Sequence, residues 1–433
     1  MKTQHPSIVI RNGRVIDPAS GHDGVADVYV SHGKIVGIGA APAGFTAHET
    51  IDATDLIVAP GLVDLSARLG EPGGEHRQLL QSELAAAVAG GVTTLCTPPD
   101  TDPTLDEPSL VEMLRHRADM LGLARVMPLG ALTRHLEGRE LTEFAALRDA
   151  GCVAFSQADA PLIDTRVLYR AMQYAATYDI QIRLRPQDVR LGADGVAHDG
   201  QVATRLGLPP VPTVAETVAI STIVILMKDT GARVHLERVS SREGLEMVQA
   251  ARSYGLKLTC DVSINHVHLA DIDIGYFDSN MRLSPPLRGV SDRDAIQHAL
   301  LDGTIDAICS DHTPVGNDEK LLPFGEARPG ASSLELLLPL TLNWADHRHV
   351  PLTRALAKIT CDPAGLIGIA AGKLAVGAAA DLCVFDPKAA WRVTPDALRS
   401  QGKHTPFAGM ELRGRVRYTL VDGRIAHQEP GAA

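Results

Sequence analysis

The sequence has little of what marks a membrane or secreted protein. No apolar run approaches the roughly 20 residues that a helix needs to cross a bilayer. Residues 1–6 lack the basic-then-apolar pattern of a secretory signal. The six cysteines are scattered and form no CxxC pair, which favours free thiols in a reducing compartment. We therefore expect a cytoplasmic protein that does not bind membranes.

The sequence also has fewer basic than acidic residues. The net charge of −11 and the lack of a concentrated basic run argue against a general nucleic-acid-binding protein. The 45% hydrophobic content, with glycine and proline spread along the chain, is typical of a folded globular protein. A length of 433 residues suits one large barrel and a smaller domain. These bulk properties leave the reaction type open.

The middle of the chain, from about residue 57 to residue 369, alternates apolar strand candidates with amphipathic helices. The expected strands are Leu62–Leu65, Gly91–Cys96, Ala124–Leu129, Cys152–Phe155, Ile180–Leu184, Arg233–Leu236, Leu256–Val262 and Ile305–Cys309. Strand–helix alternation predicts a parallel α/β domain, and eight units predict a closed (β/α)₈ TIM barrel. Functional groups in such barrels lie at the C-terminal ends of the strands.

The two ends of the chain have a different pattern of apolar and polar residues. Residues 8–17 and 26–39 alternate apolar and polar side chains, with turns at Asn12-Gly13 and His32-Gly33, and predict a small antiparallel sheet. Residues 381–386 and 417–425 repeat this pattern, with a turn at Asp422-Gly423. We expect the two ends to pair into one small β-sandwich.

Four stretches carry a family resemblance through their order and spacing. They are the segment from Ala59 to Gly73, Ala89-Gly90-Gly91-Val92-Thr93-Thr94, Pro285-Pro286-Leu287-Arg288, and the segment from Asp302 to Pro314. Together they resemble the dihydroorotase family of metal-dependent amidohydrolases over nearly the whole chain. The resemblance implies an amidohydrolase-type barrel over residues 58–370, and a β-sandwich made of residues 1–57 and 371–433.

The first strand keeps the family pattern but not its metal ligands. The family carries a zinc-binding His-x-His pair after this strand, where this chain has Ser66 and Arg68. A serine hydroxyl is a poor zinc ligand, and a guanidinium has no lone pair to offer. The substrate-binding arginine that comes next in the family is replaced by Gly70.

Further strand ends show the same loss. After strand four, active relatives carry a metal-bridging carboxylate, where this chain has Gln157 and Ala158, although Asp159 lies close by. After strands five and six, the ligand positions correspond to Arg185 and Arg238. The resemblance therefore maps most of the zinc site onto residues that do not bind metal.

Only the end of strand eight keeps a ligand. Asp311 stands where the family uses an aspartate as metal ligand and general base, and His312 belongs to the family signature. Ser284 replaces a substrate-contacting asparagine. Catalytic zinc usually has three protein ligands and an open position for water. We therefore expect no zinc, no other cofactor, no catalytic residues and no dihydroorotase activity.

The replacements suggest a role of their own. Arg68, Arg185 and Arg238 should converge on one barrel mouth, where a dinuclear site would otherwise supply positive charge. We predict that their guanidinium groups replace the metal charge by pairing with carboxylates. The candidate partners are Asp64, Asp188 and Asp311. The alternative is that the mouth is open to water and the arginines are solvated.

An amidohydrolase-type barrel that lacks its zinc-binding residues resembles the non-catalytic, dihydroorotase-like chains found with aspartate carbamoyltransferase in some bacteria. The resemblance implies a pseudoenzyme of de novo pyrimidine biosynthesis. Its expected partner is the catalytic chain of aspartate carbamoyltransferase, which it would join as a structural subunit of a dodecameric assembly.

Two other functions stay open. One is an active cyclic-amide hydrolase with a single metal in a rebuilt site, for which the candidate ligands are His235, His266, His268, His312 and Asp311. The other is a sensor whose arginine-lined mouth binds an acidic pyrimidine precursor, because arginine suits bidentate recognition of carboxylates.

Overall fold

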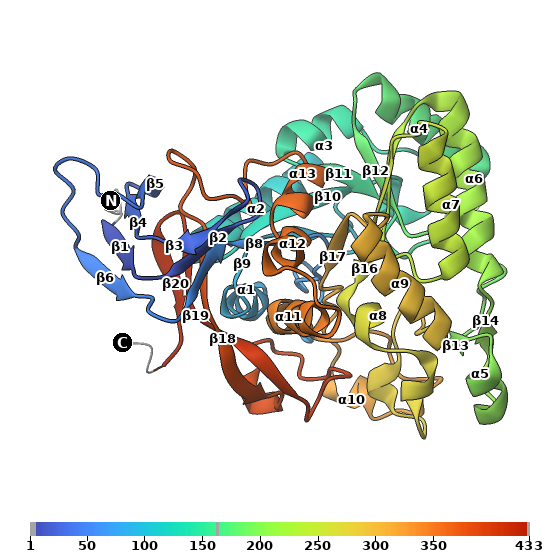
Figure 1. Ribbon diagram of the computed structural model, residues 1–433. Helices are drawn as coiled ribbons and strands as arrows, with labels where there is room; N and C mark the ends of the chain where they lie inside the picture. The colour runs from blue at the N-terminus through green and yellow to red at the C-terminus, as the bar shows by residue number, and fades with distance from the viewer. Residues whose placement is uncertain (1–5, 162–163, 431–433) are drawn as a thin grey trace.

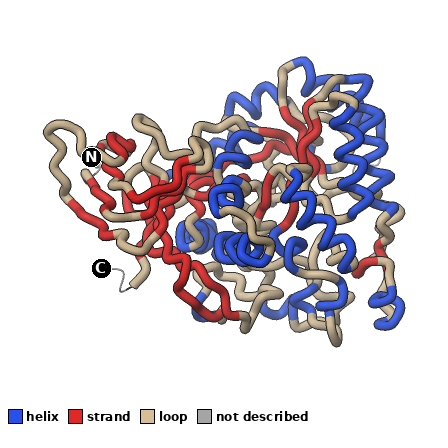
Figure 2. Tube along the Cα trace, viewed as in Figure 1, coloured by secondary structure: helices blue, strands red, loops and turns tan. Residues whose placement is uncertain are grey.

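The computed structural model describes residues 6–161 and 164–430. A sheet-rich part lies beside a larger barrel whose outer surface is helical (Figures 1 and 2). In the described part of the chain, no helix combines the length and apolar character needed to span a bilayer. Residues 1–5, which carry most of the expectation about a secretory signal, lie outside the described residues.

The barrel has eight parallel strands. In chain order they are β8 (Leu62–Asp64), β9 (Val92–Thr97), β10 (Arg125–Ala131), β11 (Ala154–Ser156), β12 (Gln181–Leu184), β15 (Arg233–Leu236), β16 (Leu258–Ser263) and β17 (Ala307–Cys309). Each strand pairs with the next, and a parallel bridge between Ala67 and His312 joins the ends of the first and last strands. All eight predicted strands are present, and the predicted (β/α)₈ barrel is confirmed.

Helices cover the outside of the barrel (Figure 1). Those between or beside the strands are α1 (Leu80–Ala89), α2 (Pro108–Leu121), α3 (Phe144–Ala150), α4 (Thr165–Thr177), α5 (Gln201–Leu206), α6 (Val214–Thr230), α7 (Arg242–Ser253), α8 (Ile264–His268), α9 (Val290–Asp302) and α10 (Asn317–Lys320). After β17 come α11 (Leu337–His347), α12 (Leu352–Ala357) and α13 (Cys361–Leu366). Helix α4 shows why they form: Asp164 caps its first turn, and Leu168, Met172 and Ala175 recur on its buried side.

The two ends of the chain form two facing sheets. The four-stranded sheet has the order β5 (Lys34–Ile38), β4 (Val28–Ser31), β1 (Ile8–Arg11), β6 (Glu49–Asp52). The six-stranded sheet has the order β20 (Arg424–Gln428), β19 (Glu411–Val421), β18 (Leu382–Arg392), β7 (Ile57–Pro60), β2 (Arg14–Asp17), β3 (His22–Val25). Both sheets contribute to one apolar core, so the predicted small sheet domain from both termini is confirmed.

One detail of this domain was predicted wrongly. The turn at Asn12-Gly13 does not join an antiparallel pair, because β1 and β2 belong to different sheets, and each pairs in parallel with a later strand. The chain crosses tightly between the sheets here: a Cβ on Gly13 would lie 2.6 Å from Cγ2 of Val58. The turn at His32-Gly33 does join an antiparallel pair, β4 and β5.

The sandwich and the barrel share one continuous stretch of chain. Strand β7 ends at Pro60 in the six-stranded sheet, and β8 begins at Leu62 in the barrel. Gly61 lies between them, where a Cβ would be 2.7 Å from the Cβ of Thr93. A side chain at this position would therefore collide with β9. The domain boundaries 1–57, 58–370 and 371–433 stay predictions. At the first boundary the chain passes from the sandwich into the barrel without a linker.

Candidate functional site at the barrel mouth

One carboxylate lies at the centre of the barrel mouth and binds three arginines. Asp159 pairs with Nη2 of Arg68 at 2.8 Å, with Nη2 of Arg238 at 2.7 Å and with Nη1 of Arg185 at 3.3 Å. The exposed fractions of the side chains of Arg68, Arg238 and Arg185 are 16%, 3% and 10% in that order. The predicted convergence of the arginines is confirmed, and the alternative of solvated arginines is wrong.

Barrel geometry explains why residues so far apart in sequence meet. Arg68, Asp159, Arg185, Arg238 and Asp311 each lie a few residues beyond the C-terminal end of a different parallel strand. Parallel strands of a closed barrel end on the same rim, so these side chains share one mouth. Arg238 and Asp311 adopt left-handed φ angles of 54° and 53°, so the chain bends sharply where it leaves β15 and β17.

Arg68 and Arg238 have partners besides Asp159. Arg68 donates from Nε to Asp100 at 2.9 Å and from Nη1 to the hydroxyl of Thr313 at 3.0 Å. Arg238 donates from Nη1 to Asp311 at 3.1 Å and to the carbonyl of Ser284 at 3.3 Å. Each of these guanidinium groups therefore bridges several strand ends.

Two of the three predicted partners are wrong. Asp64 accepts hydrogen bonds from the backbone N–H of Ser310 at 2.7 Å and from its hydroxyl at 2.5 Å. Asp188 accepts from the backbone N–H groups of Arg190 and Leu191 in its own loop. Asp64 therefore ties β8 to the end of β17, and Asp188 stabilises a turn. Only Asp311 was predicted correctly.

Sequence reasoning gave Asp159 and Asp100 too little weight. Asp159 lies two residues after Gln157, and Ala158 between them adopts a positive φ of 49°. This bend brings the loop after β11 over the mouth. A signal was present in the sequence, because three arginines expected at one barrel mouth need a nearby anion and Asp159 was the carboxylate left at the end of strand four.

Electrostatics make Asp159 a permanent anion. Burial alone would raise its pKa, but Arg238, Arg185 and Arg68 hold the pKa of Asp159 well below its ordinary value. Asp311 differs, because burial raises its pKa and the arginines only partly offset this. Asp159 therefore carries most of the charge compensation at the mouth.

The other replaced positions do not reach the cluster with their side chains. Ser66 is buried and accepts a hydrogen bond at its backbone carbonyl from the N–H of His312 at 3.1 Å. A Cβ on Gly70 would lie 2.0 Å from Cγ of Gln78, so this position has no room for a side chain. Ser284 contributes the carbonyl that accepts from Arg238.

Gln157 points to a different loop. Its Nε2 donates to the carbonyl of Leu136 at 2.8 Å, and its Oε1 accepts from the hydroxyl of Thr133 at 3.0 Å. Gln157 therefore supports the segment after β10, while Ala158 provides the bend described above.

His312 braces the end of strand eight. Its Nδ1 accepts from the backbone N–H of Ser333 at 3.0 Å, which places the ring proton on Nε2, and Nε2 donates to Glu83 at 2.8 Å. Glu83 also accepts from the hydroxyl of Ser400 at 2.6 Å. His312 thus joins β17 to α1 and to the loop before α11.

The histidines proposed for a rebuilt metal site lie apart. His235 contacts Asp261 at 3.0 Å, His266 donates to the carbonyl of Pro286 at 3.2 Å, and His268 contacts the carbonyl of Leu340 at 2.9 Å. Across residues 6–161 and 164–430, no three His, Cys, Asp or Glu side chains are grouped closely enough to hold a metal ion.

The residues at the mouth do not fit the zinc that this fold implies in its active members. The family resemblance maps Arg68, Arg185 and Arg238 onto three of the ligand positions, and guanidinium nitrogens donate hydrogen bonds without offering a lone pair. Their three positive charges, gathered around Asp159, disfavour a cation at the mouth. These residues therefore support no reaction step through a metal.

A second charged network lies inside the barrel, below the mouth. The side chains of Arg183 and Asp261 are fully buried, and Arg183 pairs with Glu237 at 3.0 Å and with Asp261 at 3.3 Å. Asp261 also accepts from the backbone N–H of Arg238 at 2.7 Å, which joins the two networks. Sequence reasoning missed Arg183 and Glu237, although a charged residue in the middle of a buried strand is a recognisable signal.

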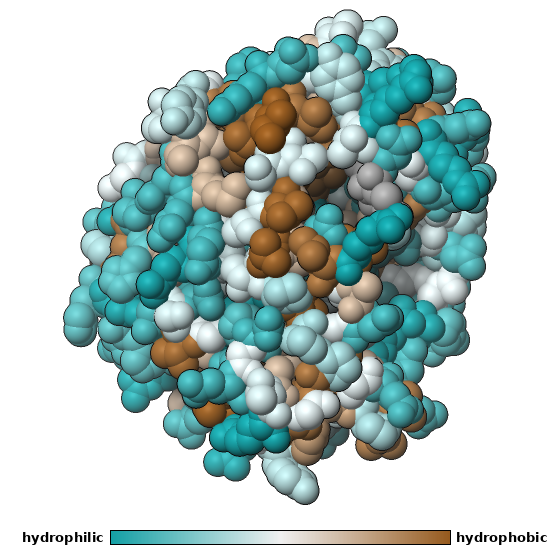
Figure 3. Space-filling model, turned by 90° about the vertical axis from the view of Figure 1, so that its right-hand side faces the viewer, coloured by the Kyte–Doolittle hydropathy of each residue, from teal (hydrophilic) through white to brown (hydrophobic). Residues whose placement is uncertain are grey.

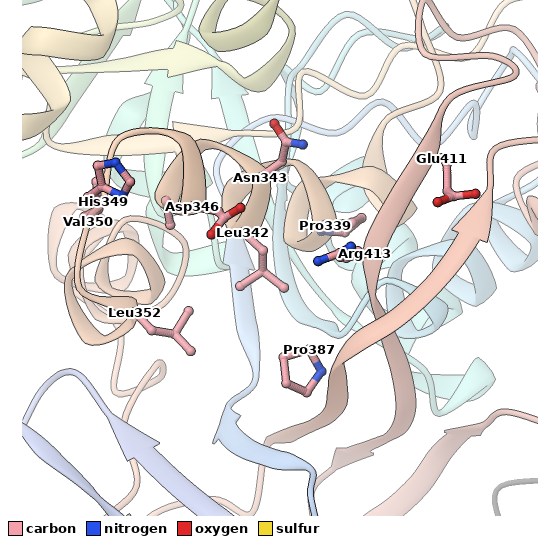
Figure 4. Close-up of a pocket in the computed structure, with 11 residues that line it drawn as sticks. Pro339, Leu342, Asn343, Asp346, His349, Val350, Leu352, Pro387, Glu411 and Arg413 are labelled. Atoms are coloured by element: carbon pink, nitrogen blue, oxygen red, sulfur yellow. The ribbon is translucent and has the colours of Figure 1, made fainter.

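A hollow in the protein surface lies away from the mouth, between α11, α12 and the hairpin of β18 and β19 (Figure 4). Its volume is about 570 Å³. Residues around it include Leu342, Asp346, Pro387, Glu411 and Arg413. None of the predicted site residues lines this hollow, so it does not contribute to the site at the mouth.

Comparison with known proteins identifies the family. A model described as "Dihydro-orotase-like" matches residues 55–244, and one described as "Amidohydrolase family" matches residues 166–427. A "Dihydroorotase-like protein" from Pseudomonas aeruginosa is 45% identical, covering 98% of this chain and 100% of its own length. A protein of the same name from Pseudomonas putida is 44% identical, covering 97% and 99%. A "Dihydroorotase" from Anaeromyxobacter dehalogenans is 38% identical, covering 98% and 99%.

Solved structures support the predicted fold. The L-hydantoinase (dihydropyrimidinase) of Arthrobacter aurescens superposes with a TM-score of 0.85 at 25% identity, covering 97% of this chain and 96% of its own. A D-hydantoinase superposes with a TM-score of 0.82 at 21% identity, covering 98% and 95%. The predicted amidohydrolase-type fold is therefore confirmed. The chain belongs to the dihydroorotase-like family of amidohydrolases.

Proposed function

We propose that this chain is a catalytically inactive dihydroorotase homologue in the cytoplasm. In this proposal it is a structural, non-catalytic subunit of an aspartate carbamoyltransferase complex in de novo pyrimidine biosynthesis. The observation that carries the proposal is the cluster in which Arg68, Arg185 and Arg238 close around Asp159.

The chemistry of the mouth supports inactivity. Hydrolysis of a cyclic amide needs an activated water and a polarised carbonyl, and both come from the metal in metal-dependent amidohydrolases. Asp159 is a poor base, because its pKa is held well below the ordinary value and the arginines occupy its oxygens. Asp311 is paired with Arg238 at 3.1 Å. No residue of the cluster is left to generate a hydroxide.

The same cluster supports a structural role. Asp159 binds residues from the ends of three other strands, and Arg68 and Arg238 extend these contacts to Asp100 and Asp311. Ion pairs therefore join the ends of these strands, in the role that we propose a metal has in active relatives. A fold kept intact around a site that has lost its ligands is expected of a subunit that is retained for its shape.

Names of relatives point the same way. The relatives at 45% and 44% identity are named "Dihydroorotase-like protein", whereas those at 38% and 37% are named "Dihydroorotase". The names alone do not assign a role, but they separate the more similar sequences from the proteins named as enzymes.

The surface offers apolar side chains to a protein partner. Helix α6 exposes Val214, Val218 and Ile225 along one side, and apolar patches appear among hydrophilic side chains on the face of the molecule where α6 and α7 lie (Figure 3). Helices that are apolar on nearly all sides are usually covered. Exposed apolar patches of this kind are typical of protein–protein interfaces.

The first test is metal content together with activity. Protein purified without chelator is analysed for zinc by elemental analysis and assayed for dihydroorotate hydrolysis. We expect well under one zinc ion per chain and no turnover. One tightly bound zinc per chain together with hydrolysis would contradict inactivity.

The second test is complex formation. The chain is co-expressed with aspartate carbamoyltransferase from the same genome, and the mixture is analysed by size-exclusion chromatography with light scattering. We expect both chains to co-elute with the mass of a dodecamer. Ile225→Asp on α6 should weaken the complex, whereas Met120→Asp, at a site 75% exposed on α2, serves as the matched control. Separate elution of the two wild-type chains would contradict the proposed partner.

A further inference from the structure

A small hollow lies beside the arginine cluster, between the ends of β11 and β12 and the helices α4 and α6. Its volume is about 140 Å³, which is room for about five water molecules at ~30 Å³ each. Its apolar wall comprises Leu168, Leu184 and Ile223, all of which are buried. Arg185 and Gln187 line it as polar groups. The hollow therefore has one apolar side and one side able to bind an anion.

Arg185 has donor capacity that the protein does not use. Its Nη1 pairs with Asp159 at 3.3 Å, the longest of the three contacts to that carboxylate, and its Nη2 donates to the amide oxygen of Gln187. Its Nε is buried and has no hydrogen-bond partner among the described residues. A single amide oxygen thus occupies an edge of the guanidinium that could hold both oxygens of a carboxylate.

The charge around Arg185 is only partly neutralised. Asp159 is shared among three arginines, and burial lowers the pKa of Arg185 more than Asp159 restores it. Arg282 adds a further positive charge nearby: burial and Arg185 lower the pKa of Arg282 to about 10. Arg282 donates to the carbonyl of Val196, and its Nε also lacks a partner among the described residues. This side of the mouth therefore favours an added anion.

Two nearby carboxylates are paired with Arg238, and a third is turned toward its own loop. Asp188 lines the hollow, and its Oδ1 accepts from the backbone N–H groups of Arg190 and Leu191. Arg190 lines the hollow as well and adds positive charge to it. Asp159 and Asp311 are engaged by Arg238.

We propose that this hollow binds a small organic acid with an apolar body. Its carboxylate accepts from Nε and Nη2 of Arg185 in place of the amide of Gln187, and its aliphatic part packs on Leu168, Leu184 and Ile223. The site needs neither a metal nor a partner chain. It therefore stands or falls independently of the proposed structural role.

The probe is pentanoate, titrated into the full-length chain by isothermal titration calorimetry. Pentanamide, which has the same body without the charge, and inorganic phosphate, which has charge without the body, are the matched ligands. We expect pentanoate to bind at one site per chain and both matched ligands to bind at least about tenfold more weakly.

Variants locate the site. Ala219→Leu fills the hollow from α6 without replacing any residue of the arginine cluster and should abolish binding of pentanoate. Arg185→Lys keeps the charge but removes the two-donor edge, and should weaken binding at least about tenfold. Arg205→Gln, at an exposed position on α5, is the control and should leave binding unchanged.

Four outcomes would overturn the proposal. Three are no heat of binding with pentanoate, equal binding of pentanoate and pentanamide, and full binding by Ala219→Leu. The fourth is phosphate binding as tight as that of pentanoate, since the arginine cluster alone would then explain the affinity.

Discussion

The barrel contains two arginine–aspartate networks that differ in their access to water. At the mouth, Asp159 is 32% exposed and binds three arginines. Inside the barrel, Arg183 and Asp261 are 0% exposed and are held together with Glu237 and His235. The two networks meet where Asp261 accepts from the backbone N–H of Arg238.

The comparison separates a partly hydrated ion-pair cluster from a fully desolvated one. A fully desolvated charge is tolerated only while its partners are present, because nothing else compensates it. A charge at the mouth can be partly compensated by water and salt when a partner is lost. The inner network should therefore be needed for folding, whereas the mouth cluster should contribute less to stability.

The largest effect is expected for Asp261→Asn. This change leaves Arg183 with less compensating charge in the barrel interior and weakens the contacts of Asp261 with His235 and Arg238. We expect a loss of about 3–5 kcal/mol in the free energy of unfolding, measured by chemical denaturation. The control is Asp149→Asn on α3, where the aspartate is 77% exposed, and it should change stability by less than about 0.5 kcal/mol.

A smaller effect is expected for Asp159→Asn. Three arginines lose their shared anion, but water reaches this position and Asp100 and Asp311 still compensate two of them. We expect a loss of about 2 kcal/mol in the free energy of unfolding, measured in the same way. A loss as large as that of Asp261→Asn would show that the mouth is as desolvated as the interior and would remove the distinction between them.

Lowering the pH should reduce the free energy of unfolding more through a buried histidine than through the carboxylate Asp159 at the mouth. Burial lowers the pKa of His266 to about 4, against about 6.5 in an unfolded chain. Between these values the unfolded chain binds more protons, so the free energy of unfolding falls as the pH falls, by at most about 1.4 kcal/mol per pH unit for this residue. His266→Gln should reduce the slope measured by denaturation between pH 6.5 and 4.5.

Asp159 at the mouth should not contribute to the slope in this pH range. The pKa of Asp159 is depressed, so its stabilising contribution is present above the unfolded value of about 3.9 and is lost only as the pH falls toward its lower folded value. Asp159→Asn should therefore keep the wild-type slope between pH 6.5 and 4.5. A flattened slope in this variant would contradict the depressed pKa.

The smallest effect on the free energy of unfolding is expected from added salt. At 1 M NaCl the screening length is about 3 Å, so charges in contact with water interact weakly. The stability lost in Asp159→Asn should shrink by a few tenths of a kcal/mol to about 1 kcal/mol between 0.05 and 1 M NaCl. The loss in Asp261→Asn should stay the same, and an equal response of both variants would contradict the difference in solvent access.

Much of the site could be predicted because barrel topology is simple. Ser66, Arg68, Arg185 and Arg238 come directly after predicted strands, and parallel strands bring the residues at their C-terminal ends to one rim. The partner of the arginines could not be predicted in the same way. Asp64 is the last residue of β8, on the same side of the barrel as Arg68, yet it binds Ser310 instead of the cluster.

The sequence by itself determined the eight strands, the sandwich at the two ends and the convergence of the arginines at the barrel mouth. Each of these is set by local apolar patterns and by residue types at strand ends. Only the tertiary structure decided that Asp159 neutralises the arginines, that Arg183 lies inside the barrel, and that β1 and β2 belong to different sheets. The physical reason is that charge pairing and strand pairing join residues distant in sequence. Their geometry depends on how the loops bend, as at Ala158 and Gly13.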